Sequence, residues 1–107
     1  MPAPVPSINH QPVALAADQF NTLQHGEIDR DQYTPTAAAA FTDALVAQVA
    51  AYLRPFGSVK TIRLDSKLPV QGDTLYHFTL TCANGVVIEL LELGQDDRIA
   101  GIRFMAQ

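Results

Sequence analysis

The sequence predicts an α+β fold in which two to three N-terminal helices pack on a curved four-stranded antiparallel sheet. Hydrophobic residues recur about every 3.6 positions in the first half of the chain and at every second position in the second half. The predicted strands are joined by connections short enough for an antiparallel meander. The chain has 107 residues, 48% of them hydrophobic, which suits one domain with a single core.

The first helix is predicted over residues 11–25. Pro12 suits the first helical position, apolar residues follow at helical spacing, and Gly26 can end the helix. The preceding residues 1–9 are rich in proline and lack apolar periodicity. We therefore expect an extended leader there, followed by a single α+β domain over residues 10–107.

A short helical turn and a longer second helix are predicted next. Asp29 followed by Gln32 is a capping-box pattern, which indicates the short turn. From Pro35 a run of alanines begins a helix that Pro55 ends. Six residues are expected to share one stripe of this helix: Phe41, Leu45, Gln48, Val49, Tyr52 and Leu53.

Alternating apolar residues predict strands at residues 59–65, 75–83, 86–93 and 99–105. Asn84 and Gly85 separate the middle two and favour a type I′ turn, which needs positive φ at both central residues. Counting outward from this two-residue loop places Leu80 opposite Glu89. Residues 67–74 are expected to form a loop.

This register predicts two different sheet faces, because opposite residues project to the same side. One face is apolar apart from a single glutamate and should contact the helices: Tyr76, Phe78, Leu80, Cys82, Val87, Glu89, Leu91 and Leu93. The other face is too apolar for a solvated surface, so it is expected to contact a second subunit or a fused or partner domain. Its interface residues are His77, Thr79, Thr81, Val86, Ile88 and Leu90. His77 is also placed opposite Glu92, as a surface pair or a pH-sensitive element.

Glu89 is the sharpest candidate for chemistry, because burial would raise its pKa and suit it to general acid or base catalysis. The alternative is that its carboxylate reaches solvent or pairs with Arg63 or Arg103. Tyr33 and Tyr76 are weaker candidates, since a tyrosine with its ring in the core and its hydroxyl bonded at the rim is the commoner case. A cavity for a small apolar ligand would be lined by Phe20, Tyr33, Phe41, Phe78, Leu80 and Glu89.

Other classes of function are disfavoured. A net charge of −4 with scattered arginines does not suit nucleic-acid binding. No apolar run approaches the roughly 20 residues needed to span a bilayer. The single cysteine, Cys82, excludes an internal disulfide, and no metal-ligand spacing, nucleophile elbow or phosphate-binding loop occurs. We expect no cofactor and no metal, and the compartment stays open between the cytoplasm and export with a signal peptide that this sequence lacks.

Three segments resemble the nuclear-transport-factor-2-like group, which has the cystatin-like fold. They are Gln24-His25-Gly26-Glu27, the stretch from Leu53 to Gly57, and Asp97-Arg98-Ile99-Ala100-Gly101-Ile102. The chain looks most like small bacterial members of the group, over about residues 12–104. The resemblance implies a half-barrel with a cavity between sheet and helices, used by enzymes, ligand carriers and dimerising modules. Catalytic members such as ketosteroid isomerase place acidic and tyrosyl groups in that cavity, but none of their site motifs matches here.

The sequence therefore favours a non-enzymatic module that binds a small ligand or another protein and dimerises or docks through its sheet face. The alternative is a small cavity enzyme that performs proton transfer or hydrolysis with Glu89 and a tyrosine.

Overall fold

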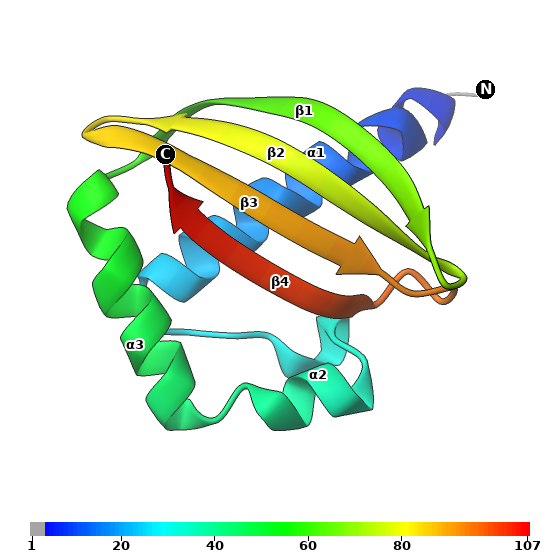
Figure 1. Ribbon diagram of the computed structural model, residues 1–107, viewed down its shortest axis with the longest axis horizontal. Helices are drawn as coiled ribbons and strands as arrows, with labels where there is room; N and C mark the ends of the chain where they lie inside the picture. Colours follow the sequence, from blue (N-terminus) through cyan, green and yellow to red (C-terminus); the bar gives the residue numbers. More distant parts are fainter. Residues whose placement is uncertain (1–3) are drawn as a thin grey trace.

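The computed structural model describes residues 4–107, with side chains described from residue 12 onward. Three helices and two 3-10 turns come first: α1 (Pro4–Gln24), η1 (Arg30–Gln32), α2 (Pro35–Ala40), α3 (Asp43–Leu53) and η2 (Arg54–Phe56). Four strands follow: β1 (Val59–Val70), β2 (Asp73–Cys82), β3 (Gly85–Leu93) and β4 (Ile99–Ala106). The strands form one antiparallel sheet in the order β1-β2-β3-β4 (Figure 1).

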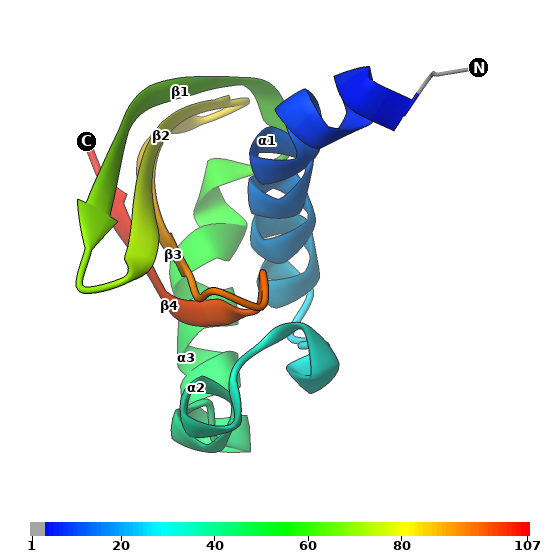
Figure 2. The same ribbon diagram turned by 90° about the vertical axis from the view of Figure 1, so that its right-hand side faces the viewer.

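The sheet is curved and open, and α1 and α3 lie on its concave side (Figure 2). The helices cover one face because an amphipathic helix and a half-apolar sheet each need a partner layer. The predicted α+β fold is confirmed, with helices first and a four-stranded antiparallel meander after them.

Helix α1 begins earlier than predicted. It starts at Pro4, so residues 4–9 are helical, and the expectation of an extended leader is wrong for them; residues 1–3 lie outside the described part. Pro4 and Pro6 are compatible with the first turn, where backbone N–H groups have no helical partner in any case. Pro12 lies inside the helix, and the helix changes direction along its N-terminal part (Figure 2).

The predicted second helix is two helices. Phe41 leaves helical geometry with φ −86° and ψ 79°, and the Thr42 side chain accepts a hydrogen bond of 3.2 Å from the Leu45 N–H. A threonine that caps a new helix offers the backbone an alternative to continuing the old one. As a result the buried stripe of α3 consists of Val46, Ala50 and Leu53.

The β1–β2 hairpin differs from the prediction. Strand β1 continues through Pro69 to Val70, where a loop was expected, and Pro is tolerated because β1 is an edge strand. Gln71 and Gly72 form the two-residue turn, with φ of +52° and +90°. Positive φ at both central residues is the feature that was predicted for Asn84 and Gly85.

The β2–β3 turn consists of Ala83 and Asn84, since Cys82 lies opposite Gly85. Asn84 is held by η2, because its N–H donates to the Phe56 carbonyl and its side chain donates to the Pro55 carbonyl. Asn84 therefore does not adopt the positive φ of a type I′ turn.

The strand pairs consequently move by two positions relative to the prediction. Glu89 lies opposite Phe78 and not Leu80, and His77 lies opposite Leu90 and not Glu92. Because the shift is even, every residue keeps its predicted face.

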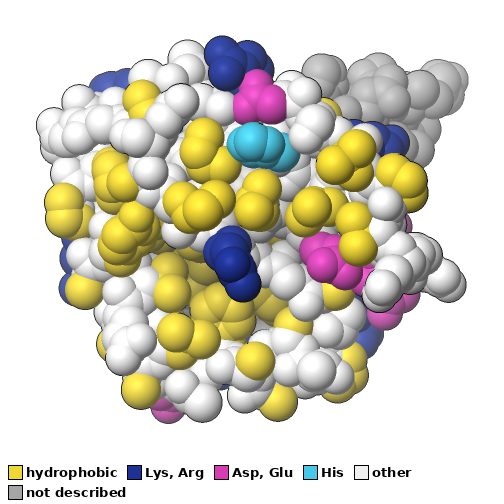
Figure 3. All heavy atoms as spheres, in the orientation of Figure 1, with side chains coloured by type: hydrophobic (Ala, Val, Ile, Leu, Met, Phe, Trp, Pro, Cys, Tyr) yellow, Lys and Arg dark blue, Asp and Glu magenta, His cyan; other side chains and the backbone are white. Residues whose placement is uncertain are grey.

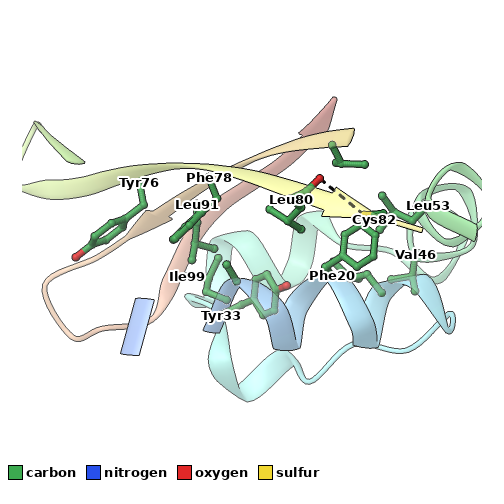
Figure 4. Close-up of a cluster of buried hydrophobic side chains, with 13 residues drawn as sticks. Phe20, Tyr33, Val46, Leu53, Tyr76, Phe78, Leu80, Cys82, Leu91 and Ile99 are labelled. Carbon is green, nitrogen blue, oxygen red and sulfur yellow. Dashed lines mark hydrogen bonds between the residues drawn. The ribbon is translucent and has the colours of Figure 1, made fainter. Parts of the chain in front are cut away.

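We call the face away from the helices the outer face. It includes Leu68, Asp73, Leu75, His77, Thr79, Thr81, Val86, Ile88, Leu90, Glu92, Arg103 and Met105. Hydrophobic side chains spread across this face (Figure 3). On the other side of the sheet, the core joins α1, α3 and the strands (Figure 4). Phe20 and Phe104 meet there edge to face, with ring centroids 6.0 Å apart.

Candidate functional site

Glu89 occupies the interior between the sheet and the helices. It lies opposite Phe78 on β2 and Phe104 on β4, and its exposed fraction is 0%. Neither carboxyl oxygen has a hydrogen-bond partner among the described residues. Burial raises the pKa of Glu89 well above its usual range, because the charged form of the carboxyl group is disfavoured away from water.

The arginines considered as partners for Glu89 lie elsewhere. Arg63 pairs with Asp65, and Arg103 projects from the outer face opposite Leu90. The expected alternatives of a solvated or ion-paired Glu89 are therefore wrong.

Tyr33 enters the same interior from the segment after η1. Its backbone forms a parallel bridge with Ile99, its ring packs edge to face on Phe41, and only 2% of it is exposed. The hydroxyl donates a 2.7 Å hydrogen bond to Oε1 of Gln19. Burial is the main cause that raises the pKa of Tyr33, so its hydroxyl stays protonated and donates this bond.

Gln19 completes this polar group and was not singled out from the sequence. Its Nε2 donates a 2.7 Å bond to Oε1 of Gln32, which belongs to η1. Gln32 thus binds α1 and does not close a capping box, while Asp29 does cap η1 by accepting from the Asp31 N–H. The sequence does place Gln19 at helical spacing from Ala16, which is buried, but it does not show that Tyr33 lies against Gln19.

Tyr76 is not brought to this group. Its ring stacks on Phe78 with centroids 6.1 Å apart, and the Nζ of Lys67 lies 5.9 Å from its centroid. The Tyr76 hydroxyl points away from Tyr33 (Figure 4). Of the two candidate tyrosines, both belong to the buried core, but only Tyr33 hydrogen-bonds to Gln19.

The expected cavity residues lie in one layer between sheet and helices. Phe20, Phe78 and Leu80 are fully buried beside Glu89 and Tyr33, and Phe41 is half-buried. Their rings and aliphatic groups pack against one another as part of the core (Figure 4). A hollow is visible between β4 and the helices α2 and α3, with hydrophobic side chains at its bottom (Figure 3).

The outer face carries the largest exposed aliphatic side chains of the sheet. Leu68 is 53% exposed and Met105 is 41% exposed, at opposite edges of the sheet. Between them, Val86, Ile88 and Leu90 are half-buried. The interface residues expected from the sequence therefore lie on the two central strands, between an exposed aliphatic side chain at each edge of the sheet, and three of the six are themselves aliphatic.

Polar groups on the outer face are arranged around these residues. Asp65 accepts hydrogen bonds from Thr79 and Arg63, and these bonds lower the pKa of its carboxyl. A second hollow of about 230 Å³ lies toward β4, lined by Leu75, Leu90, Glu92, Gly101, Ile102 and Arg103. This surface has both an apolar floor and a charged rim.

No protein-family model, curated protein or solved structure matches this chain. The resemblance to the nuclear-transport-factor-2-like group stays a prediction. Among the described residues, no three His, Cys, Asp or Glu side chains converge as a metal site would require, and none of the helices has the length and hydropathy that crossing a bilayer demands. His10, one of the three histidines of the chain and so a possible metal ligand by residue type, has its side chain outside the described part.

Proposed function

We propose that the protein is a non-enzymatic interaction module that forms a homodimer through its outer face. The observation that carries the proposal is the exposure of Leu68 on β1 and Met105 on β4, with half-buried aliphatic residues of β2 and β3 between them on the same face. Contiguous exposed apolar surface usually marks an interaction site. A second copy supplies the same apolar face in return, as a two-fold interface requires.

The packing of the interior supports an interaction module over an enzyme. Glu89 and Tyr33 are both enclosed by the core, so a substrate would have to displace packed side chains to reach them. General acid or base catalysis needs the acting group within hydrogen-bond reach of the substrate. The exposed aliphatic side chains of Leu68 and Met105 lie instead on the outer face, where a partner can contact them.

A pair of matched substitutions tests the dimer. Leu68→Asp places a charge in the proposed interface, whereas Leu64→Asp changes a leucine of the same strand that is 40% exposed but projects to the helix side, opposite Phe78. We expect Leu68→Asp to raise the dimer dissociation constant about 100-fold or more, because a buried unpaired charge costs several kcal/mol. Sedimentation equilibrium measures it, with circular dichroism as a check of folding.

The Leu64→Asp variant should keep the affinity of the unchanged chain. Equal weakening by both substitutions, or none by either, contradicts the proposal. So does an unchanged chain that stays monomeric at the concentrations used.

A second candidate function, an interior site for a small polar-headed ligand, is favoured by the two unpartnered oxygens of Glu89. Buried polar groups usually have a partner, and a ligand hydroxyl would supply one. Phenol is a suitable probe because it has an apolar ring and one O–H donor. We expect phenol to raise the thermal midpoint of the unchanged chain more than that of Glu89→Leu; equal or absent shifts contradict this second candidate.

A further inference from the structure

The outer face holds one arginine and one acidic pair that form no ion pair among the described residues. Arg103 is exposed and takes part in none of the ion pairs formed by residues 12–107, which involve Arg30, Arg63 and Arg98. It lines the same hollow as Glu92. A basic side chain lies near the centre of this face, and acidic side chains lie to its right (Figure 3).

The acidic pair consists of Glu92 on β3 and Asp73 at the start of β2. A hydrogen bond between the two carboxyl groups raises the pKa of Glu92. Two carboxyl groups this close repel each other when both are ionised, and a nearby cation relieves that repulsion. No described cation of the same chain forms an ion pair with either carboxylate.

The hollow between these charges is suited to a protein side chain. Its volume of about 230 Å³ is below the range of about 300–1,000 Å³ typical of small-molecule pockets. Gly101 contributes no side chain, and a Cβ there would lie 3.8 Å from Glu92. The floor is aliphatic, from Leu75 and Leu90.

We infer that a second copy of this chain docks on the outer face about a two-fold axis through this hollow, with Arg103 of each copy against the Asp73–Glu92 pair of the other. This inference rests on the proposed homodimer and specifies how it is oriented. Two-fold symmetry forms the contact twice, since each copy supplies both the arginine and the acidic pair. Charge complementarity of this kind fixes the orientation of an apolar interface.

A charge-exchange experiment tests the inference. Arg103→Glu and Glu92→Arg each place like charges together twice in a homodimer, so each variant alone should dimerise about ten-fold or more weakly than the unchanged chain. In an equimolar mixture both contacts become opposite-charge contacts. The mixture should therefore form heterodimers with an affinity close to that of the unchanged chain, measured by sedimentation with one variant fluorescently labelled.

Arg98→Glu is the matched control, because it makes the same charge change in the turn before β4, off the outer face. It should leave the dissociation constant unchanged. Weakened single variants without recovery in the mixture, or no weakening at all, overturn the inference; the homodimer itself then still stands if Leu68→Asp dissociates it. A monomeric unchanged chain overturns both the homodimer and this orientation.

Discussion

Glu89 on β3 lies directly opposite Phe104 on β4, and the carboxyl group is sealed in the core with neither oxygen hydrogen-bonded by the described residues. The neighbours on the two adjacent strands, Phe78 and Phe104, are both apolar, so burial is the main cause of the raised pKa of Glu89. Burial favours the neutral form of the carboxyl group, and the raised pKa of Glu89 has a measurable consequence for stability.

The stability of the protein should fall as pH rises because of Glu89. Its pKa is raised in the folded state, so below the unfolded pKa of about 4.3 both states hold the proton and there is no penalty. Above that pH the unfolded chain releases the proton while the folded chain keeps it, and the free energy of unfolding decreases by up to about 1.4 kcal/mol per pH unit until the folded pKa is reached.

Glu89→Gln removes this ionisation while keeping the shape of the side chain. We expect the free energy of unfolding of the variant, relative to the unchanged chain, to rise with pH from about 4.3, the unfolded pKa of glutamate, until the raised folded pKa of Glu89 is reached. Urea titrations at several pH values measure the difference. A constant difference across that range would mean that Glu89 is not buried in its neutral form.

Tyr33→Phe should destabilise the protein by about 1–3 kcal/mol. The substitution removes the hydroxyl that donates to Gln19 and leaves a buried amide oxygen without its partner. Tyr52→Phe is the control, because the Tyr52 hydroxyl accepts its hydrogen bond from Ala106 at an exposed site. The Tyr52→Phe substitution should change the free energy of unfolding by no more than about 0.5 kcal/mol. If urea denaturation shows the same decrease for both variants, the buried hydrogen bond of Tyr33 does not stabilise the protein more than the exposed one.

Thr42→Ala should cost about 1 kcal/mol, because it removes the side-chain oxygen that caps α3. Thr36→Ala changes an exposed threonine inside α2 and should be neutral or slightly stabilising, since alanine has the higher helix propensity. Thermal unfolding followed by circular dichroism compares the two. A loss at position 36 as large as at position 42 would argue against the capping role.

The dimer should weaken as salt is added, if Arg103 and the Asp73–Glu92 pair set its orientation. Ions screen charges near a protein surface over about 10 Å at 0.1 M and about 3 Å at 1 M. The apolar contacts are not screened, so a residual affinity should persist at high salt. Sedimentation at 0.05 and 0.5 M sodium chloride measures the dissociation constant of the dimer. A dissociation constant that stays the same or falls at 0.5 M would count against the ion pairs.

The sequence placed Glu89 in the interior correctly although the predicted strand pairs were shifted, because the shift was an even number of residues. Side chains alternate along a strand, so placing Glu89 opposite Leu80 or opposite Phe78 puts it on the same face. The turn itself was mispredicted because Asn84 makes hydrogen bonds to η2, a contact between distant parts of the chain that local preference does not contain.

Two other features depended on information that local patterns do not hold. Thr42 has a weak helix preference and a strong capping preference, and tertiary packing decides between them. Gln19 was overlooked because a glutamine on an apolar stripe is interpretable only when Tyr33 is known to lie against it. The outer face, by contrast, followed directly from apolar alternation in β2 and β3.

The mass of the unchanged chain in solution tests the central claim most directly. Light scattering after size-exclusion chromatography, over protein concentrations from about 1 to 100 μM, should give a species that approaches twice the 11.6 kDa of one chain. The same measurement on Leu68→Asp should give one chain throughout. A constant mass of 11.6 kDa for the unchanged chain across the whole range would contradict dimerisation through the outer face.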